Sequence, residues 1–286
     1  MINILGTGLT GLVGSRIVEL LSDRYSFENL SLETGVDITQ KDVVNERIRL
    51  SRASWVFHFA AYTDVDKAEE EKNKKMESTS WLVNVEATKN IVETCQAFNK
   101  RLLYVSTDFV FDGKSKETYD ENDVPHPLGW YAITKFEAEN LVMSLKDKAL
   151  IVRISFPYCN SNQHKKDFVH KIIERLQRNE RVNACSDQII VPTLIDDIAL
   201  AIDMLLSNNA SGIVHVVGSQ SLTPLEIAMK IARKFMYNES LIYPMIFSQY
   251  YQNRAPRPFH AILSNDKISK FGVHMSTFDE GLKKIA

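Results

Sequence analysis

The first half of the chain alternates short apolar runs, rich in β-branched residues, with longer segments in which apolar residues recur at helical spacing. This alternation is typical of βαβ units on a parallel sheet. The predicted strands cover residues 2–5, 30–32, 55–60, 102–106 and 150–154. The pattern predicts an α/β fold, a Rossmann-type doubly wound parallel sheet with a smaller C-terminal lobe.

Helical periodicity is clearest between the first two strands, where Val13, Ile17 and Leu21 give one apolar face. Further helices are predicted over residues 81–98, 167–177 and 195–206, and a strand over 213–217. Two late helices have marked starts, because Thr223 and Thr277 are each followed three residues later by Glu.

The periodicity loosens after about residue 155, which suggests two interleaved parts. We expect a dinucleotide-binding domain over residues 1–155, with residues 195–217 completing its sheet. Residues 156–286 are expected to form the smaller substrate-binding lobe.

Composition narrows the function classes. The chain has 286 residues, 44% of them hydrophobic, enough for a full core. Its 34 basic and 36 acidic residues nearly cancel and form no basic patch, which argues against a nucleic-acid partner. Apolar stretches such as 55–61 are too short for a membrane span, so we expect a soluble, unexported, cytoplasmic protein. Cys95, Cys159 and Cys185 lack paired spacing and are expected to be reduced and structural.

A glycine-rich turn follows the first strand directly and opens the first helix. It predicts a pyrophosphate site, because glycine lets the backbone approach the phosphates and a helix N-terminus favours negative charge. Gly8, Gly11 and Gly14 are the expected trio. The whole predicted turn consists of Gly8, Leu9, Thr10, Gly11, Leu12, Val13 and Gly14.

An acidic residue at the end of the second predicted strand bears on the choice of cofactor. Glu33 is placed to accept hydrogen bonds from the adenosine ribose, and its carboxylate would repel a 2′-phosphate. We therefore favour NAD(H) and leave NADP(H) open. Asp37 and Ile38 are expected to cover the adenine, and Phe59, Ala60 and Ala61 to line the cofactor site.

Tyr131 and Lys135 are four residues apart, so on a helix both side chains point the same way. A neighbouring ammonium is expected to lower the tyrosine pKa from its usual value of about 10. Lys135 is also placed to hold a nicotinamide ribose. Thr107, in Ser106-Thr107-Asp108, ends the fourth predicted strand, where its hydroxyl can bind a substrate carbonyl.

Taken together, these segments resemble the dTDP-4-dehydrorhamnose reductases, a sugar-nucleotide branch of the extended short-chain dehydrogenases. The resemblance covers nearly the whole chain. Its more specific stretches are Tyr62-Thr63-Asp64-Val65-Asp66-Lys67-Ala68-Glu69 and Ser106-Thr107-Asp108-Phe109-Val110-Phe111-Asp112-Gly113. Further matches are Arg153-Ile154-Ser155, Asp187-Gln188, Val191-Pro192-Thr193 and Arg257-Pro258.

The resemblance implies a catalytic set of Thr107, Tyr131 and Lys135, with Asn84 supporting a proton relay on the lysine side. It also implies that Thr63 and Asn84 belong to the cofactor site. Substrate-facing positions are expected at Asp108, Phe109, Ser155, Phe156 and Arg257, the arginine facing the nucleotide.

Three positions depart from the family pattern. Ala132 stands where the family usually has Gly, Phe156 stands where it has Trp, and Ala261 does not supply the serine found near Arg257-Pro258. These departures leave the identity of the sugar open.

The predicted reaction is reduction of a keto group on a nucleotide-linked deoxysugar, with Tyr131 as proton donor. One alternative is an epimerase or dehydratase with tightly bound NAD, since Asp108 supplies the carboxylate that a dehydratase needs beside Thr107. The other is a cofactor-binding regulatory subunit without catalysis. Apart from the nucleotide-sugar, no partner is required, and a homodimer is left open.

Histidine offers no predicted metal site. His164 and His170 lack a third ligand at metal spacing, so we expect no zinc. His58, in the middle of a strand, is expected to be a hydrogen-bonded core residue.

Overall fold

A computed structural model describes residues 1–114, 117–160 and 166–285. Its centre is a parallel sheet with the strand order β2-β1-β3-β4-β5-β9. The strands are β1 (Ile2–Thr7), β2 (Tyr25–Leu30), β3 (Trp55–His58), β4 (Arg101–Thr107), β5 (Ala149–Ile154) and β9 (Gly212–His215). The strand order changes direction between β1 and β3, which is where ligands bind in doubly wound sheets.

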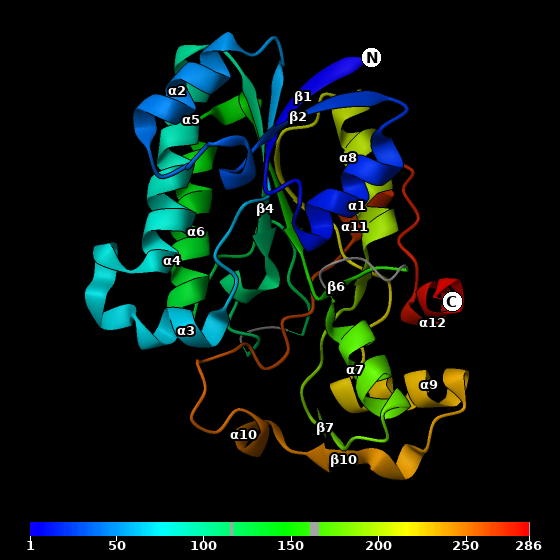
Figure 1. The fold of residues 1–286 in the computed structure, drawn as a ribbon. Coiled ribbons are helices and arrows are strands. Elements are labelled where there is room, and N and C mark those ends of the chain that lie inside the picture. The colour runs from blue at the N-terminus through cyan, green and yellow to red at the C-terminus, as the bar shows by residue number, and fades with distance from the viewer. Residues whose placement is uncertain (115–116, 161–165, 286) are drawn as a thin grey trace.

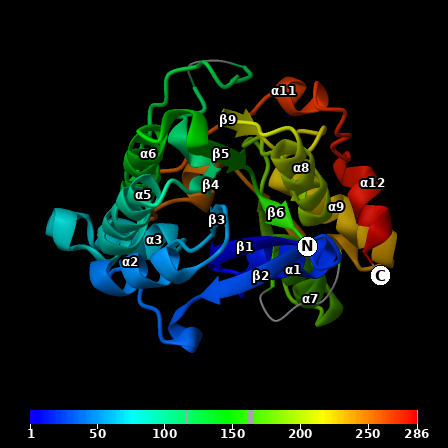
Figure 2. The same ribbon diagram turned by 90° about the horizontal axis from the view of Figure 1, so that it is seen from above.

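Helices cover both faces of the sheet (Figures 1 and 2). One face carries α2 (Lys41–Leu50), α5 (Ala87–Ala97) and α6 (Trp130–Met143). The other carries α1 (Leu12–Leu21) and α8 (Ile195–Ser207). Each layer buries its own apolar cluster, because the side chains of a strand alternate between the two faces: Ile4 belongs to the cluster under α1 and α8, and Leu5 to the one under α2 and α5.

The helix before α5 is interrupted by a π-helical turn. Helix α4 (Thr79–Trp81), the turn η3 (Leu82–Glu86) and α5 run on without a break in helical backbone. Such turns often occur at functional sites. Helix α3 (Val65–Glu70) precedes them and packs near the start of α6.

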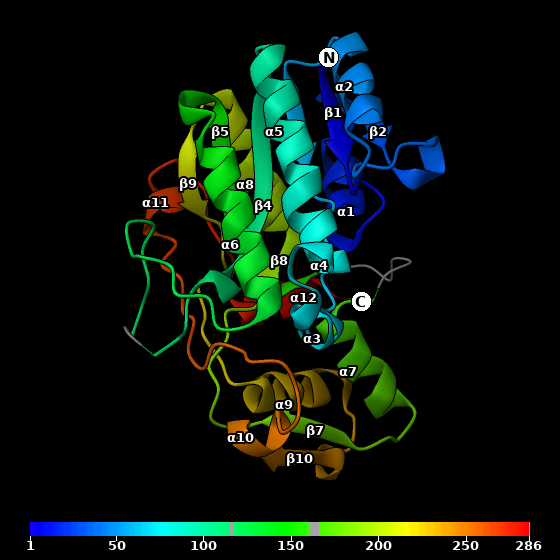
Figure 3. The ribbon, with the colours of Figure 1, turned by 90° about the vertical axis from the view of Figure 1, so that its left-hand side faces the viewer.

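A second lobe lies beyond the carboxyl ends of the strands (Figures 1 and 3). It contains α7 (Phe168–Gln177), α9 (Pro224–Phe235), α10 (Phe247–Tyr250) and the parallel pair β7 (Val182–Cys185) and β10 (Ile242–Met245). A second parallel pair joins β6 (Pro157–Tyr158) to β8 (Thr193–Leu194). The lobe has its own apolar cluster, which includes Val169, Ile231 and Phe278.

Shorter elements complete the chain. They are the 3-10 helices η1 (Leu32–Thr34), η2 (Lys72–Glu77), η4 (Asp108–Val110), η5 (Lys146–Lys148) and η6 (Glu239–Leu241), with helices α11 (Asp266–Ser269) and α12 (Phe278–Lys284).

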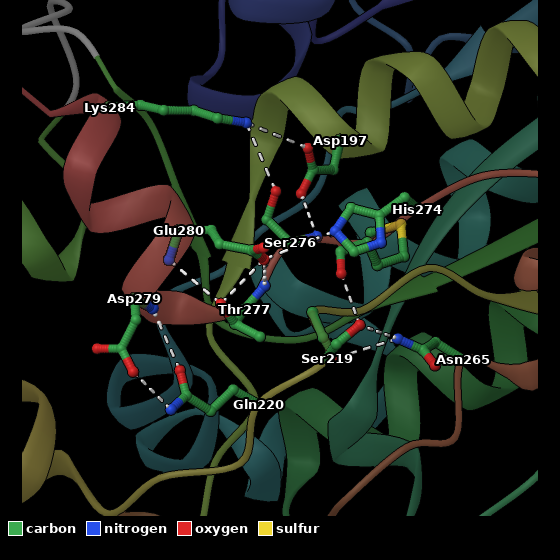
Figure 4. A network of polar contacts seen from close by, with 12 residues as sticks. Asp197, Ser219, Gln220, Asn265, His274, Ser276, Thr277, Asp279, Glu280 and Lys284 are labelled. Atoms are coloured by element: carbon green, nitrogen blue, oxygen red, sulfur yellow. Dashed lines mark hydrogen bonds and ion pairs between the residues drawn. The ribbon is translucent and has the colours of Figure 1, made fainter.

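A polar network fixes the C-terminal helix α12 (Figure 4). Asp197 of α8 accepts a hydrogen bond of 2.8 Å from the backbone N–H of Ser276. Gln220 exchanges two hydrogen bonds with Asp279, through its side-chain amide. Thr277 and Glu280 form the predicted capping box. The last helix is thereby tied to the layer that covers the sheet.

Most predicted elements are confirmed, often with small shifts at their ends. Helices α7 and α8 differ from prediction by one residue at an end, and Thr223 caps α9 as expected. The second strand was predicted wrongly at residues 30–32. The true strand β2 runs over Tyr25–Leu30, where buried and exposed side chains alternate on the sheet edge, and Leu32 lies in η1. None of the helices among the described residues combines the length and apolar character of a membrane span.

Candidate active site

A cavity of about 960 Å³ lies at the carboxyl ends of β1, β3 and β4. It brings the glycine turn together with Thr107, Tyr131 and Lys135. The other predicted residues that line it are Thr10, Leu12, Val13, Glu33, Asp37, Ile38, Phe59, Ala60, Ala61, Thr63, Asp108, Phe109 and Phe156. Segments predicted separately for cofactor and catalysis thus share one cavity.

The glycine turn has the close backbone contacts that its composition predicts. Gly8 has φ +66°, and a Cβ there would lie 2.4 Å from the backbone nitrogen of Ala60. A Cβ on Gly14 would lie 2.4 Å from the carbonyl oxygen of Gly8. Gly11 is the N-cap residue of α1 and makes no side-chain cap, so helix N–H groups remain for a ligand. The turn therefore fits a pyrophosphate at the strand-order reversal.

Leu9 is the one turn residue outside the cavity lining, because its side chain packs over Gly6. Glu33 lines the cavity from the 3-10 helix η1, not from the end of a strand as predicted. The register error of β2 explains this correction. Ser31, which directly follows β2, also lines the cavity and was missed.

Tyr131 and Lys135 lie on consecutive turns of α6 and are both buried. The Lys135 ammonium donates a 2.9 Å hydrogen bond to the carbonyl of Val105 and lies 4.1 Å from the ring centre of Tyr104. Thr107 ends β4, where its hydroxyl oxygen accepts the N–H of Phe109 at 3.2 Å.

The pKa of Tyr131 differs from the prediction. Burial raises the Tyr131 pKa well above its usual value, and Thr107 offsets this only in part. Burial also lowers the pKa of Lys135 to about 7, so its ammonium is itself disfavoured in this site. Desolvation outweighs the expected effect of the ammonium, and it keeps Tyr131 in its protonated form.

Asn84 lies in the π-helical turn, outside the cavity lining. Its side-chain oxygen accepts the N–H of Tyr62 at 2.8 Å, and its amide donates to Thr134 at 2.9 Å. Asn84 thus links the segment after β3 to helix α6. These contacts give it a structural place beside the site, and its relay role stays a prediction.

His58 is hydrogen-bonded in the core, as expected. Thr88 donates to the carbonyl of Asn84 at 2.6 Å, so it must accept from His58 Nε2 at 2.9 Å. His58 Nδ1 then accepts from Thr7, 2.7 Å away. Burial lowers the His58 pKa to about 3, which agrees with this neutral tautomer.

Two acidic residues of the motif that suggested the family, Asp66 and Glu69, lie on helix α3 and hold neighbouring segments in place. Asp66 pairs with Arg257 at 2.8 Å and accepts the N–H of Ala255 at 3.0 Å. Glu69 accepts the N–H of Trp130, the first residue of α6, at 2.8 Å. Arg257 therefore lies against α3 and outside the cavity lining.

The start of α6 also stacks against α4. The rings of Trp81 and Trp130 lie 5.8 Å apart at an interplanar angle of 21°. Trp130 donates its indole N–H to Ser78 at 2.9 Å. This contact, with Glu69, holds the helix turn that carries Tyr131.

Beside Tyr131, aromatic rings form part of the cavity wall. Phe109 makes edge contacts with Tyr131 at 5.8 Å between ring centres, and lies 6.4 Å from Phe156. Asp108 is buried and accepts hydrogen bonds from Thr107 at 3.0 Å and Ser155 at 2.7 Å. Ser155 is fully buried behind Asp108 and does not line the cavity.

Sequence reasoning missed several cavity residues. These are Leu30, Ser31, Leu32, Val36, Thr39, Val65, Thr79, Leu82, Val83, Val105, Ser106, Ile154 and Pro157. Most are apolar and carry no chemical signal of their own. Ser106 did carry a signal in the sequence, since it directly precedes Thr107. Its buried hydroxyl has no hydrogen-bond partner among the described residues.

Histidine gives no metal site in the described part of the chain, where no cluster of three His, Cys, Asp or Glu side chains is arranged for an ion. His170 pairs with Asp167 at 2.8 Å. His164 lies outside the described residues.

Comparison with known proteins places this geometry in a family. The chain matches the family described as RmlD substrate binding domain over residues 2–286. A dTDP-4-dehydrorhamnose reductase of Aggregatibacter actinomycetemcomitans is 31% identical, over 100% of this chain and 98% of the relative.

Two further relatives widen the comparison. The crystal structure of a Bacillus anthracis dTDP-4-dehydrorhamnose reductase in complex with NADP has a TM-score of 0.90 and 28% identity, and covers 100% of this chain and 99% of that chain. A methionine adenosyltransferase 2 subunit beta from Xenopus laevis is 27% identical over 97% of this chain and 85% of its own. With a match that spans all but its first residue, the chain belongs to the RmlD substrate binding domain family.

Proposed function

We propose that this protein uses NAD(P)H to reduce the keto group of a nucleotide-linked deoxysugar, as a dTDP-4-dehydrorhamnose reductase does. The observation that carries the proposal is a single cavity lined by the glycine turn and by Thr107, Tyr131 and Lys135. The relatives from A. actinomycetemcomitans and B. anthracis, matched over 98% and 99% of their lengths, support the same reaction.

The chain's own residues divide the work. The cofactor, when bound, supplies a hydride for the keto carbon. Tyr131 gives its proton to the keto oxygen, which completes the alcohol, and burial keeps the phenol protonated until then. Thr107 binds the same oxygen, and Lys135 holds the ribose beside the Tyr131 phenol.

Cofactor preference is a finer proposal. We favour NAD(H), because the Glu33 carboxylate lines the cavity near the segment that follows β2 and would repel a 2′-phosphate. NADP(H) remains an alternative cofactor, which the NADP bound in the B. anthracis relative supports.

The substrate-binding roles are proposals too. Asp108, Phe109 and Phe156 are proposed to face the sugar from the cavity wall. Ser155 is proposed to act through Asp108, and Arg257 to reach the nucleotide from the loop that Asp66 holds. The two-lobe division at residue 155, a cytoplasmic location and a homodimer remain predictions from the sequence.

The test is an assay of cofactor consumption with dTDP-linked 4-keto-6-deoxysugars, run with NADH and NADPH in parallel. We expect one cofactor oxidised per sugar reduced, and a higher kcat/KM with NADH. Tyr131→Phe should lower kcat by about 10²- to 10⁴-fold with little change in cofactor affinity.

The matched control is Tyr243→Phe, an exposed tyrosine on β10, which should keep wild-type turnover. Product formed without net oxidation of cofactor would point to epimerisation instead. Full turnover in Tyr131→Phe would remove Tyr131 as proton donor.

A further inference from the structure

The hydroxyl of Thr107 has one proton, and its hydrogen-bond partners indicate where that proton points when Asp108 is ionised. Its oxygen accepts from Phe109 and lies 3.0 Å from Asp108 Oδ1, to which it donates. While Asp108 is ionised, this hydroxyl has no second proton to give to a keto oxygen. A Thr107 that binds the substrate carbonyl as a donor needs Asp108 in another state.

The other Asp108 oxygen is fixed as well. Ser155, at the end of β5, donates to Oδ2 at 2.7 Å, and both residues are buried. The carboxyl group therefore bridges the ends of β4 and β5 at the cavity wall, with one oxygen held by Thr107 and the other by Ser155. A dehydratase acid would need to contact the sugar itself, so these contacts favour a positioning role.

We infer that Asp108 is a positioning residue that directs the Thr107 hydroxyl: ionised Asp108 draws its proton away from the keto oxygen, and neutral Asp108 releases it. In the neutral state the carboxylic acid donates to Thr107, and Thr107 donates to the keto oxygen alongside Tyr131. This inference rests on the proposed reductase function, because it assumes a keto oxygen in the cavity.

The electrostatic surroundings allow both states near neutral pH. Burial raises the Asp108 pKa to about 6, and the hydrogen bonds from Ser155 and Thr107 oppose that rise. Substrate that displaces water from the cavity disfavours the charged form further. Tyr131 on α6 is close enough for the Asp108 charge to raise its pKa, and Lys135, whose pKa burial lowers to about 7, also titrates near neutral pH.

The rate of reduction should depend on the protonation state of Asp108. Reduction should be fastest at low pH and fall as pH rises through the Asp108 pKa, because the second donor to the keto oxygen is lost. One such donor contributes roughly 100- to 1,000-fold in kcat, and about 1% of Asp108 is still neutral at pH 8, so we expect a fall of about 50- to 80-fold between about pH 5 and about pH 8. Deprotonation of Lys135 would contribute a second fall, which variants must separate from the first.

Two variants make that separation. Asp108→Asn keeps a donor for Thr107 and an acceptor for Ser155, so it should abolish the first fall and raise kcat at about pH 8 above the wild-type value. Ser155→Ala removes a hydrogen bond to the carboxylate, so the fall should move to higher pH. A Lys135 titration should stay in place in both. Asp120→Asn, at an exposed position outside the cavity lining, is the control.

An infrared measurement tests the inference even if the proposed function fails. The carbonyl stretch of protonated Asp108, identified by its loss in Asp108→Asn, should titrate well above the ordinary aspartate pKa and shift upward in Ser155→Ala. Wild type that turns over no ketosugar would reject the proposed function alone. A normal Asp108 titration, or Asp108→Asn with less activity than wild type at every pH, would overturn the inference.

Discussion

Two glycines show how the same backbone conformation has different costs at different places. Gly8 and Gly35 both have positive φ, of +66° and +75°. A Cβ on Gly35 meets nothing within 4 Å, whereas one on Gly8 would press against the backbone of Ala60. Only Gly8 lies in the cavity wall.

We therefore expect Gly35→Ala to lower the free energy of unfolding by about 1 kcal/mol, the cost of a left-handed backbone with a side chain. Gly8→Ala should cost roughly 1–3 kcal/mol more, because the strand ends must separate. It should also weaken NADH binding at least tenfold. Thermal unfolding and cofactor titration of both variants check this, and equal losses in the two would refute the steric explanation.

For single residues, the sequence predicted the type of chemistry better than it predicted where each side chain lies. Residues with a distinctive motif, such as Thr107, Tyr131 and Lys135, reach the cavity as predicted. Arg257 and Ser155 do not, because each is held by a carboxylate whose position depends on the packing of distant elements. The Tyr131 pKa was predicted in the wrong direction, since sequence spacing reveals a neighbouring charge but not the burial that outweighs it.

Helix α3 acts as an element that sets the position of others. Through Asp66 it holds the loop around Ala255, and through Glu69 it holds the first turn of α6. The site thus depends on a helix of which only Val65 lines the cavity.

Glu69→Ala should lower the free energy of unfolding by about 1 kcal/mol, since it leaves the Trp130 N–H without its acceptor. It should reduce kcat more than the affinity for NADH, because the turn that carries Tyr131 loosens. Chemical denaturation and steady-state kinetics measure the two effects. Glu70→Ala, at the exposed neighbouring position, is the control, and a like effect there would argue against a role for the cap.

Elements were predictable where the local signal was strong. Helices with a Thr and Glu capping box begin where predicted, because the cap is a local interaction. The edge strand β2 was misplaced, because one of its faces is partly exposed and its apolar pattern is weak. The short strands β6 and β8 were missed, since two residues carry no periodicity.

Across the whole molecule, two buried histidines couple folding to pH. His58 in β3 and His215 in β9 each have a pKa lowered to about 3, mainly by burial. The unfolded chain binds protons at both residues near the ordinary value of 6.5, and the folded chain does not. Folding stability should therefore decrease as pH falls from about 6.5 toward about 3.

Each buried histidine contributes a slope of up to about 1.4 kcal/mol per pH unit in this range. His58→Gln should remove one such contribution, which denaturant unfolding at about pH 6 and about pH 5 measures as a smaller loss of stability than in wild type. His126→Gln, at an exposed side chain, should follow the wild-type curve. If His58→Gln follows it too, His58 is not the proton-linked residue.

The architecture was predictable because independent features of the sequence indicate the same fold. The alternation of strand and helix, the glycine turn after β1 and the Tyr-Lys spacing all favour one parallel sheet. The second lobe was less predictable, since its strands pair across long stretches of chain: β7 joins β10 from about sixty residues away. Contacts between elements so distant in sequence leave little local pattern.

The stacked indoles of Trp81 and Trp130 also give this protein intrinsic fluorescence close to the start of α6. The chain has three tryptophans, and two of them, Trp81 and Trp130, lie beside the turn that carries Tyr131. Tryptophan emission overlaps the absorption of a reduced nicotinamide, so we expect energy transfer from these rings to a bound cofactor to report its binding without a label. The same fluorescence would follow the first turn of α6 in real time during a single turnover.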